Sequence, residues 1–183
     1  MYKILYEACP DKPFLMSVNF SANQFAHQAD LIPEVLNDTG LNPQILVIEI
    51  TERAVMDDAE FAMGKLQRMK DLGVSFIIDD YGTGYSCLQY LKLMPVDSLK
   101  IDRSFVAGLG KDSGDTAIIS GTINLAHALG LRVVAEGVET AEQLKLLKEL
   151  ECDLAQGYYL SEPLADEEVQ KLLSGDLRQW PAK

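Results

Sequence analysis

Short apolar stretches alternate with longer amphipathic stretches along most of the chain. Six of the apolar stretches have the length and the β-branched and aromatic content of strands: 14–20, 45–50, 75–80, 98–101, 131–135 and 155–160. Helix-length amphipathic stretches lie between most of them. Strands that alternate with helices form βαβ units, which place their strands side by side in a parallel sheet. The pattern therefore predicts an α/β domain built on parallel strands.

Three of the intervening stretches have apolar residues at helical spacing. The residues expected to face the core are Phe61, Leu66, Met69 and Leu72 in a helix at 57–72; Ile118, Ile119, Thr122, Ile123, Ala126 and Leu129 in a helix from about 115 to 129; and Leu144, Leu147 and Leu150 in a third helix. Gly73 and Gly130 follow the first two helices, as is common at helix ends. Thr140 and Gln143 have the spacing of a capping box at the start of the third.

Length and composition predict one domain over residues 1–183. Nearly half of the residues, 48%, are apolar, which is enough for a sizeable core. The net charge of −12 argues against binding to polymeric nucleic acid, which requires Lys and Arg, but it is compatible with a small phosphate ligand held through a metal. No secretory signal or long apolar run is found, so we expect a cytoplasmic protein without direct membrane contact. Cys9, Cys87 and Cys152 lack metal-binding spacing, and we expect reduced thiols.

Polar residues lie at the ends of nearly all the expected strands. They are Asn19, Glu49, Asp79, Asp80, Lys100, Asp102, Glu136 and Gln156. In a parallel β/α barrel the carboxyl ends of the strands share one face and converge on one site. Asn, Asp and Glu offer oxygen ligands, which suit Mg²⁺, Mn²⁺ or Ca²⁺ and do not suit zinc. The strand ends therefore predict a metal site.

Asp79 and Asp80 are the centre of this prediction. They follow an apolar run directly and precede a glycine-rich turn. Adjacent carboxylates raise each other's pKa unless a cation neutralises them. Lys70 is the only Lys or Arg within ten residues of the pair on either side, so a divalent metal ion is the expected neutraliser.

Two hard cations about 3.5–4 Å apart can clamp a phosphodiester and lower the pKa of a shared water molecule. Asp79 and Asp80 are suited to hold one metal each, or one of them to bridge two metals. Lys100 could orient the attacking water or offset charge on the phosphate. Glu136 could complete a metal shell or accept a proton.

Several of these residues also have structural interpretations. Asn19 could cap a turn, Glu49 could face outward from its strand, and Lys100 could form an ordinary ion pair with Asp102. Other polar residues are expected to be solvated, capping or non-catalytic: Glu52, Glu139, Glu142, His27 and His127, with Glu52 the best exception among the acids.

Six blocks resemble the signature segments of the EAL domain family. They are SVNFSANQF at 17–25, IEITE at 48–52, IDDYGTGYS at 78–86, LKIDRSF at 99–105, VAEGVET at 134–140 and QGY at 156–158. They occur in the family's order and cover nearly the whole chain. The resemblance implies a (β/α)8 TIM-like barrel that hydrolyses cyclic di-GMP to linear pGpG with Mg²⁺ or Mn²⁺ at a two-metal site.

The resemblance also implies a role for each matching residue. The implied metal ligands are Asn19, Glu49, Asp79, Asp80 and Glu136. Lys100 would assist the attacking water, and Glu136 and Asp80 would belong to the catalytic set with it. Gln156 and Asp102 would bind substrate. Glu52 would anchor the loop after Asp79-Asp80, which in this family couples metal binding to dimer contacts.

One departure from the family pattern changes the expected activity. The tripeptide Glu-Ala-Leu, which in the family supplies a metal-ligand Glu and is followed by a phosphate-contacting Arg, is absent from the chain. Six strands are expected where a closed barrel has eight. We therefore expect a domain incomplete at its N-terminus, with the first two β/α units missing and residues 1–9 as the remnant of a helix. The site should be incomplete and hydrolysis weak or absent.

Two interpretations of the whole chain remain open. One is a phosphodiesterase domain from a longer protein, fused to or paired with sensory or GGDEF-type domains and able to form a homodimer. The alternative is a non-catalytic EAL-like module that binds cyclic di-GMP or a protein partner in signalling.

Overall fold

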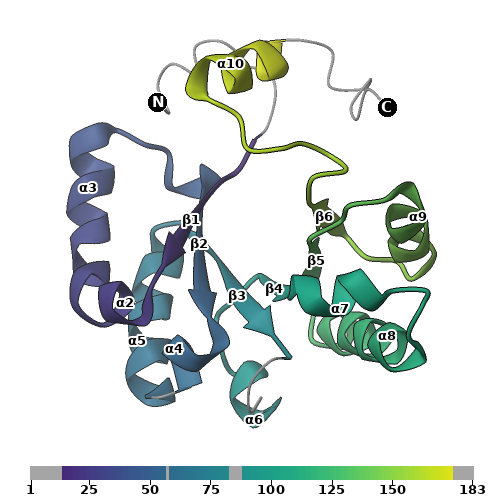
Figure 1. The fold of residues 1–183 in the computed structure, drawn as a ribbon. Helices are drawn as coiled ribbons and strands as arrows, with labels where there is room; N and C mark the ends of the chain where they lie inside the picture. The colour runs from purple at the N-terminus through teal and green to yellow at the C-terminus, as the bar shows by residue number, and fades with distance from the viewer. Residues whose placement is uncertain (1–13, 57, 83–87, 175–183) are drawn as a thin grey trace.

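The fold is a parallel sheet of six strands in which each strand pairs with the next strand along the chain (Figure 1). It comes from a computed structural model that describes residues 14–56, 58–82 and 88–174. The strands are β1 (Met16–Phe20), β2 (Leu46–Thr51), β3 (Ser75–Tyr81), β4 (Ser98–Ile101), β5 (Arg132–Glu136) and β6 (Leu154–Gln156). The sheet curls from β1 to β6, and the two edge strands do not pair with each other in the described part of the chain. The architecture is a half-barrel.

Helices cover the outer, convex side of the sheet (Figure 1). They are α2 (Ala22–Gln28), α3 (Ile32–Thr39), α4 (Glu52–Met56), α5 (Ala59–Asp71), α6 (Leu88–Leu91), α7 (Arg103–Gly108), α8 (Ser113–Ala128) and α9 (Ala141–Glu149), with short 3-10 turns η1 (Ala29–Leu31) and η2 (Pro43–Ile45). The last helix, α10 (Asp166–Ser174), lies apart from these at the top of Figure 1. Among the described residues, no helix has the length and apolarity needed to cross a bilayer.

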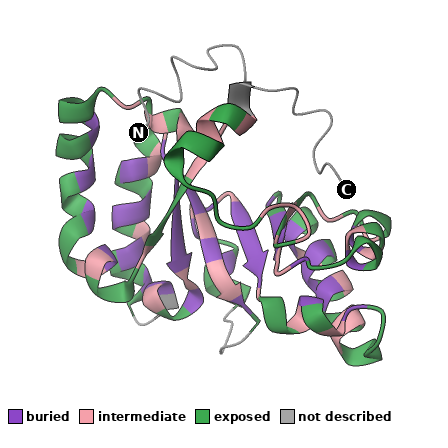
Figure 2. Cartoon of the chain, turned by 45° about the horizontal axis from the view of Figure 1, so that its top comes forward, coloured by how far each residue is buried: buried purple, intermediate pink, exposed green. Residues whose placement is uncertain are grey.

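The two faces of the sheet differ in chemistry. The convex face packs against the helices through an apolar set: Ile48, Ile50, Phe76, Ile78, Leu99, Ile101, Val133 and Ala135. The residues that alternate with them face the concave side and include Ser17, Asn19, Glu49, Asp79, Ser98, Lys100, Arg132, Glu136 and Gln156. Figure 2 shows buried residues concentrated in the middle strands and on the inner sides of the helices. The core therefore lies between sheet and helices, and the concave face carries the polar strand-end residues beside buried Val47 and Val134.

The strand boundaries expected from the sequence agree with the structure within two residues, except at β6. The strand expected at 155–160 ends at Gln156. The carbonyl of Gly157 instead accepts hydrogen bonds from the N–H groups of Leu160 and Ser161, which closes a turn. The apolar residues after Gln156 misled the prediction because a turn that contains tyrosine and leucine has the same local composition as a short strand.

Three residues expected in the core are exposed: Phe61, Leu72 and Ile118. The buried stripe of α5 runs through Ala62, Leu66 and Met69, and Phe61 lies beside that stripe. Ile118 precedes the fully buried Ile119, and consecutive helical residues point about 100° apart, so both cannot face inward. Leu72 is the C-cap of α5 and lies past the last buried turn.

The capping box expected at the third helix is present. Thr140 Oγ1 accepts from the N–H of Gln143 at 3.1 Å, and Gln143 Oε1 accepts from the N–H of Thr140 at 3.0 Å. Gln143 Nε2 also donates to the carbonyl of Val106 at 3.0 Å, so the same side chain joins α9 to α7. The helix expected within residues 1–9, Cys9 and Cys87 lie outside the described residues, and Cys152 is a free thiol.

An aspartate clamp occurs twice at the amino ends of the strands. Asp97, before β4, accepts from the N–H of Phe76 at 2.8 Å and pairs with Lys70 at 2.5 Å. Asp153, before β6, accepts from the N–H of Val133 at 2.8 Å and contacts His127 Nε2 at 2.8 Å. Each aspartate thus ties the beginning of one strand to the preceding strand and to the helix before it. His127 is therefore part of a structural contact at the amino ends of the strands, opposite to the end that carries the candidate site.

We expect Asp153→Ala to lower the free energy of unfolding by about 1–3 kcal/mol, because the N–H of Val133 loses its acceptor. Burial opposes ionisation of Asp153, but the hydrogen bonds from His127 and from the N–H of Val133 outweigh it and lower the pKa below 3.8. The ionised clamp therefore stabilises the fold above that pH, and the contribution is lost as pH falls through the folded pKa. Urea unfolding at several pH values measures both effects.

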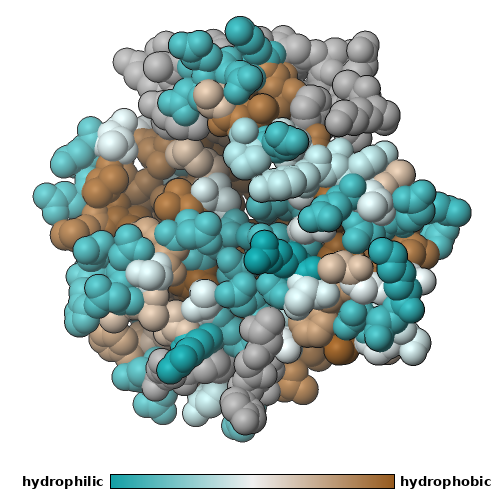
Figure 3. Space-filling view, in the orientation of Figure 1, coloured by the Kyte–Doolittle hydropathy of each residue, from teal (hydrophilic) through white to brown (hydrophobic). Residues whose placement is uncertain are grey.

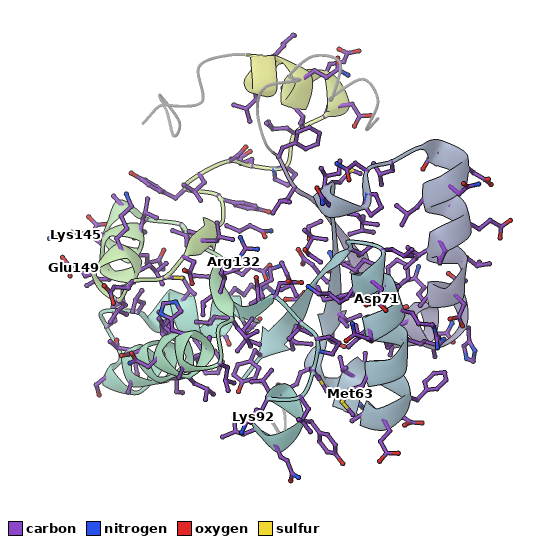
Figure 4. The ribbon with its side chains drawn as sticks, turned by 180° about the vertical axis from the view of Figure 1, so that it is seen from behind. Met63, Asp71, Lys92, Arg132, Lys145 and Glu149 are labelled. Atoms are coloured by element: carbon purple, nitrogen blue, oxygen red, sulfur yellow. The ribbon has the colours of Figure 1, made fainter. Side chains whose placement is uncertain are left out.

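The matched control is Glu149→Ala, which removes the exposed Lys145–Glu149 pair on the outer side of α9 (Figure 4). That change should cost less than about 0.5 kcal/mol. An Asp153→Ala effect no larger than the control would show that the clamp does not stabilise the sheet.

Candidate functional site

Lys100 lies at the centre of the concave face, on β4, and is 3% exposed. Its Nζ donates to Glu49 Oε2 at 2.7 Å. The same Nζ lies 3.7 Å from Asp79 Oδ1 and 3.6 Å from Glu136 Oε2. Four consecutive strands, β2 to β5, therefore send a charged side chain to one point.

Glu49 is buried and both of its oxygens are satisfied. Oε2 accepts from Lys100, and Oε1 accepts from Ser17 Oγ on β1. The interpretation in which Glu49 faces outward into solvent is therefore wrong. Ser17 is a contributor that the sequence analysis did not single out. The available signal was its position two residues before Asn19, which puts both side chains on the same face of a strand.

The electrostatic environment explains how a carboxylate cluster is tolerated here. Burial raises the pKa of Asp79, and the positive charge of Lys100 and the N–H of Asp80 only partly offset it. Burial alone would lower the pKa of Lys100, but the hydrogen bond to Glu49 and the charges of Glu49, Asp79 and Glu136 raise it. The cation that the sequence near Asp79 lacked is thus supplied by the neighbouring strand.

A β-bulge alters the backbone at the Asp79-Asp80 pair. The register between β3 and β4 shifts between Ile78 and Tyr81, and Asp80 adopts a left-handed conformation with φ of 56°. In a regular strand, consecutive side chains point to opposite faces. The bulge removes that constraint on Asp80, in keeping with the tendency of bulges to re-aim side chains at functional sites.

Glu52 begins α4 directly after β2 and is 4% exposed. Its Oε2 accepts from the N–H of Gly82 at 3.4 Å, and its Oε1 has no hydrogen-bond partner among the described residues. Gly82 is the first residue after Tyr81, where β3 ends. The loop-anchoring role expected for Glu52 stays a prediction, since residues 83–87 lie outside the described chain.

The remaining expected site residues lie around this cluster without joining it. Asp102 is the N-cap of α7 and accepts from the N–H of Ser104. Among the described residues Lys100 pairs with the three clustered acids and not with Asp102, so the alternative ion pair is not formed. Asn19 pairs in register with Glu49, and Gln156 with Glu136, and both are exposed. Asn19 does not cap α2, because that position belongs to Ser21.

Glycines permit close approach between segments at the carboxyl ends of β5 and β6. Gly137, which follows Glu136, has a φ of 79°, and a Cβ there would lie 2.6 Å from Arg103 Cβ. At Gly157 a Cβ would lie 2.2 Å from the carbonyl oxygen of Val138. Hydrogen bonds from Val138 N–H to Gln156 and from Tyr159 N–H to Val138 run alongside this contact. Glu136 and Gln156 are thereby held at adjacent positions on the rim.

The donor set matches a hard divalent cation in chemistry, because it consists of carboxylate oxygens with an amide nearby. In the described part of the chain, however, no three His, Cys, Asp or Glu side chains converge closely enough to hold one metal ion. The point toward which Glu49, Asp79 and Glu136 are directed is taken by the Lys100 ammonium. Figure 3 shows hydrophilic residues gathered over the middle of the molecule, within a ring of mixed surface.

Comparison with known proteins identifies the family. The family model of the EAL domain matches residues 3–163. The chain belongs to the EAL domain family.

Relatives of this EAL domain agree with that assignment. The bifunctional diguanylate cyclase/cyclic di-GMP phosphodiesterase MucR of Pseudomonas aeruginosa is 44% identical over 157 residues, which are 84% of this chain and 23% of MucR. A solved MucR phosphodiesterase in complex with c-di-GMP has a TM-score of 0.82 at 43% identity and covers 85% of this chain and 64% of that structure. The EAL domain of Mycobacterium smegmatis DcpA has a TM-score of 0.86 at 39% identity, covering 94% of this chain and 78% of that domain. The chain therefore spans about a quarter of its curated relative MucR.

We expect Gly137→Ala to destabilise this EAL domain by about 1–3 kcal/mol, because the new methyl group would overlap Arg103 and the residue would be strained at positive φ. The control is Gly121→Ala in α8, where a Cβ meets nothing within 4 Å. That change should stabilise by about 0.5–1 kcal/mol. Thermal or urea unfolding measures the stability of both variants. Equal stability of the two would show that the contact between Gly137 and Arg103 does not require glycine.

Proposed function

We propose that this EAL domain is the metal-dependent catalytic part of a phosphodiesterase that hydrolyses cyclic di-GMP to linear pGpG with Mg²⁺ or Mn²⁺. The observation that carries the proposal is the convergence of Glu49, Asp79 and Glu136 on Lys100 at the centre of the concave face. The relationship to MucR, named as a cyclic di-GMP phosphodiesterase, supports the substrate.

The roles proposed for individual residues follow from their positions. Bound metal ions would supply Lewis acidity at the phosphate and a more acidic water. Asn19, Glu49, Asp79, Asp80 and Glu136 would hold them. Glu136 is partly exposed at the rim, where it could also accept a proton from the attacking water.

Lys100 and Gln156 would act on the substrate rather than on the metals. Lys100 carries a positive charge on a flexible chain, which suits it to orient water or to offset charge on the phosphate. Gln156, exposed beside Glu136, would hydrogen-bond the ligand. Asp102 would contact the substrate from the N-terminus of α7, and Glu52 would hold the loop that begins at Gly82.

We further propose that the half-barrel is the main part of a (β/α)8 barrel whose first two β/α units are not in this chain. The two edge strands β1 and β6 support this proposal, because both are more exposed than the strands between them. In natural proteins, the edge strands of a sheet are normally protected by pairing with a further strand or by a covering helix or loop. The EAL domain would act within a longer protein with sensory or GGDEF-type domains, and it could form a homodimer.

A second candidate function is binding of cyclic di-GMP, or of a protein partner, without hydrolysis. The observation in its favour is the absence of the Glu-Ala-Leu tripeptide from the 183 residues. Loss of one metal ligand should reduce turnover more than it weakens contacts to the guanine bases.

For this chain of 183 residues, we expect cyclic di-GMP and Mn²⁺ to yield pGpG far more slowly than about 1 s⁻¹, because the ligand set lacks the Glu of that tripeptide. Chromatographic detection of pGpG gives the rate, and calorimetry with cyclic di-GMP gives the affinity. Slow hydrolysis with measurable affinity favours an incomplete enzyme. Turnover at about 1 s⁻¹ or faster would contradict the expectation, and binding with no pGpG at all favours the second function.

In a protein that carries the complete barrel, Asp79→Asn should abolish metal-dependent turnover, because an amide cannot supply the charge that a carboxylate gives to a divalent cation. The rate of pGpG formation across a Mn²⁺ titration measures it. The matched control is Asp71→Asn on the outer side of α5 (Figure 4), which should retain the parent rate. Near-normal activity of Asp79→Asn would remove Asp79 from the metal site.

A further inference from the structure

We propose that Lys100 is a built-in substitute for a divalent cation: its ammonium holds the metal-binding carboxylates together in the metal-free protein, and a metal ion binds by displacing it from Glu49. The inference rests on the proposed metal-dependent function and adds an intramolecular competitor to it. Its consequence is that Lys100 weakens metal binding while it stabilises the metal-free fold.

The geometry supports competition between Lys100 and a metal ion for the same carboxylates. Among the described residues, each ion pair made by Glu49, Asp79 or Glu136 is made with Lys100, at 2.7, 3.7 and 3.6 Å respectively. The Lys100 ammonium lies between the three carboxylates, so a metal ion that bridges Glu49 to Asp79 or Glu136 at that point has to displace it. The absence of a ready three-carboxylate site in the described chain agrees with this, since the carboxylates are arranged around Nζ.

Ser17 directs this competition to one oxygen of Glu49. It donates to Glu49 Oε1, so Oε2, the oxygen engaged by Lys100, is the one that the serine leaves for a cation. Glu49 is only 6% exposed, which limits its freedom to turn toward a second ligand. A metal ion that approaches Oε2 from the side of Asp79 and Glu136 therefore meets the lysine there.

The charge balance leads to the same conclusion. With Glu49, Asp79, Asp80 and Glu136 ionised, the cluster carries four negative charges, and Lys100 reduces the net charge to −3. One divalent cation would bring it to −1 and two would bring it to +1, which one phosphodiester charge then balances. With Lys100 in place the cluster still attracts a divalent cation, but less strongly than four carboxylates without the lysine would.

The concave face carries a second cationic side chain, Arg132, which does not neutralise the clustered acids. Arg132 lies at the start of β5 (Figure 4), in register with Ser98, two residues before the position that pairs with Lys100. It is exposed, and no ion pair between it and the clustered acids is found in the described residues. The competition is therefore specific to Lys100.

The test compares Lys100→Met with Lys70→Met. Both lysines pair with a carboxylate, but Lys70 pairs with Asp97 at the other end of the strands. Mn²⁺ affinity is measured by calorimetry, and the melting temperature is measured without metal and at saturating Mn²⁺. Neither readout depends on hydrolysis.

We expect Lys100→Met to bind Mn²⁺ about tenfold more tightly than the parent chain, because a repelling charge is removed. Without metal it should melt lower by at least about 5 °C, and this gap should close at saturating Mn²⁺. Lys70→Met should leave the affinity unchanged and keep the same melting deficit with and without metal.

An unchanged or weaker Mn²⁺ affinity in Lys100→Met, or a melting deficit that persists in saturating Mn²⁺, overturns the competition while leaving the proposed metal site standing. Mn²⁺ binding by Lys100→Met but not by the parent chain supports it in its strongest form. If neither protein binds Mn²⁺, the metal site of the proposed function is overturned together with this inference.

A measurement on the unsubstituted chain keeps the inference testable if Lys100→Met does not fold. Acetylation of Lys100, followed by mass spectrometry with Lys70 as internal reference, should be slow without metal, because the amine is buried and paired. Saturating Mg²⁺ should accelerate it several-fold as the amine leaves Glu49. An acetylation rate that does not respond to Mg²⁺ overturns the inference.

Discussion

The buried contact between Lys100 and Glu49 is the interaction on which the concave face depends. A carboxylate that is 6% exposed and an ammonium that is 3% exposed are each costly to bury alone, and the hydrogen bond between them makes both tolerable. The contact spans β3, since Glu49 lies on β2 and Lys100 on β4. It therefore ties three strands together on the concave face of the sheet. Asp79 and Glu136 join the same ammonium more loosely, at 3.7 and 3.6 Å.

One face of the sheet stabilises the fold, and the other carries the residues of the candidate site. The convex face is apolar and is held by helices, and its aspartate clamps and capping residues lie at strand starts or at helix ends. The concave face carries charges at the strand ends, where parallel strands of an EAL domain converge. The bulge at Asp80 and the close approach at Gly137 are local departures from regular geometry. Both lie at that same end, which agrees with the tendency of functional sites to store such departures.

The sequence predicted the elements better than it predicted which helical side chains are buried. Strand periodicity is strong and short-range, so all six strands are where they were expected, although β6 is shorter. On α5, the sequence placed Phe61 in the core by hydrophobicity, whereas the structure buries Lys65 in its stripe instead. Lys65 can be buried there because its Nζ reaches the carbonyl of Ala26 at 2.5 Å and Asp30 at 3.1 Å. Such compensation comes from a different helix, and no local pattern contains it.

Taken by itself, the sequence determined the α/β class, the order of the units, the family and the residues at the strand ends, because these depend on residue type and on spacing along the chain. Tertiary structure alone decided which charges meet. Asp79 has no cation near it in sequence except Lys70, yet Lys70 pairs with Asp97, and Lys100 from the adjacent strand takes its place beside Asp79. Strand register sets that choice, and register is a relation between segments far apart in the chain. The same relation brings Ser17 to Glu49 and leaves Asp102 as a helix cap.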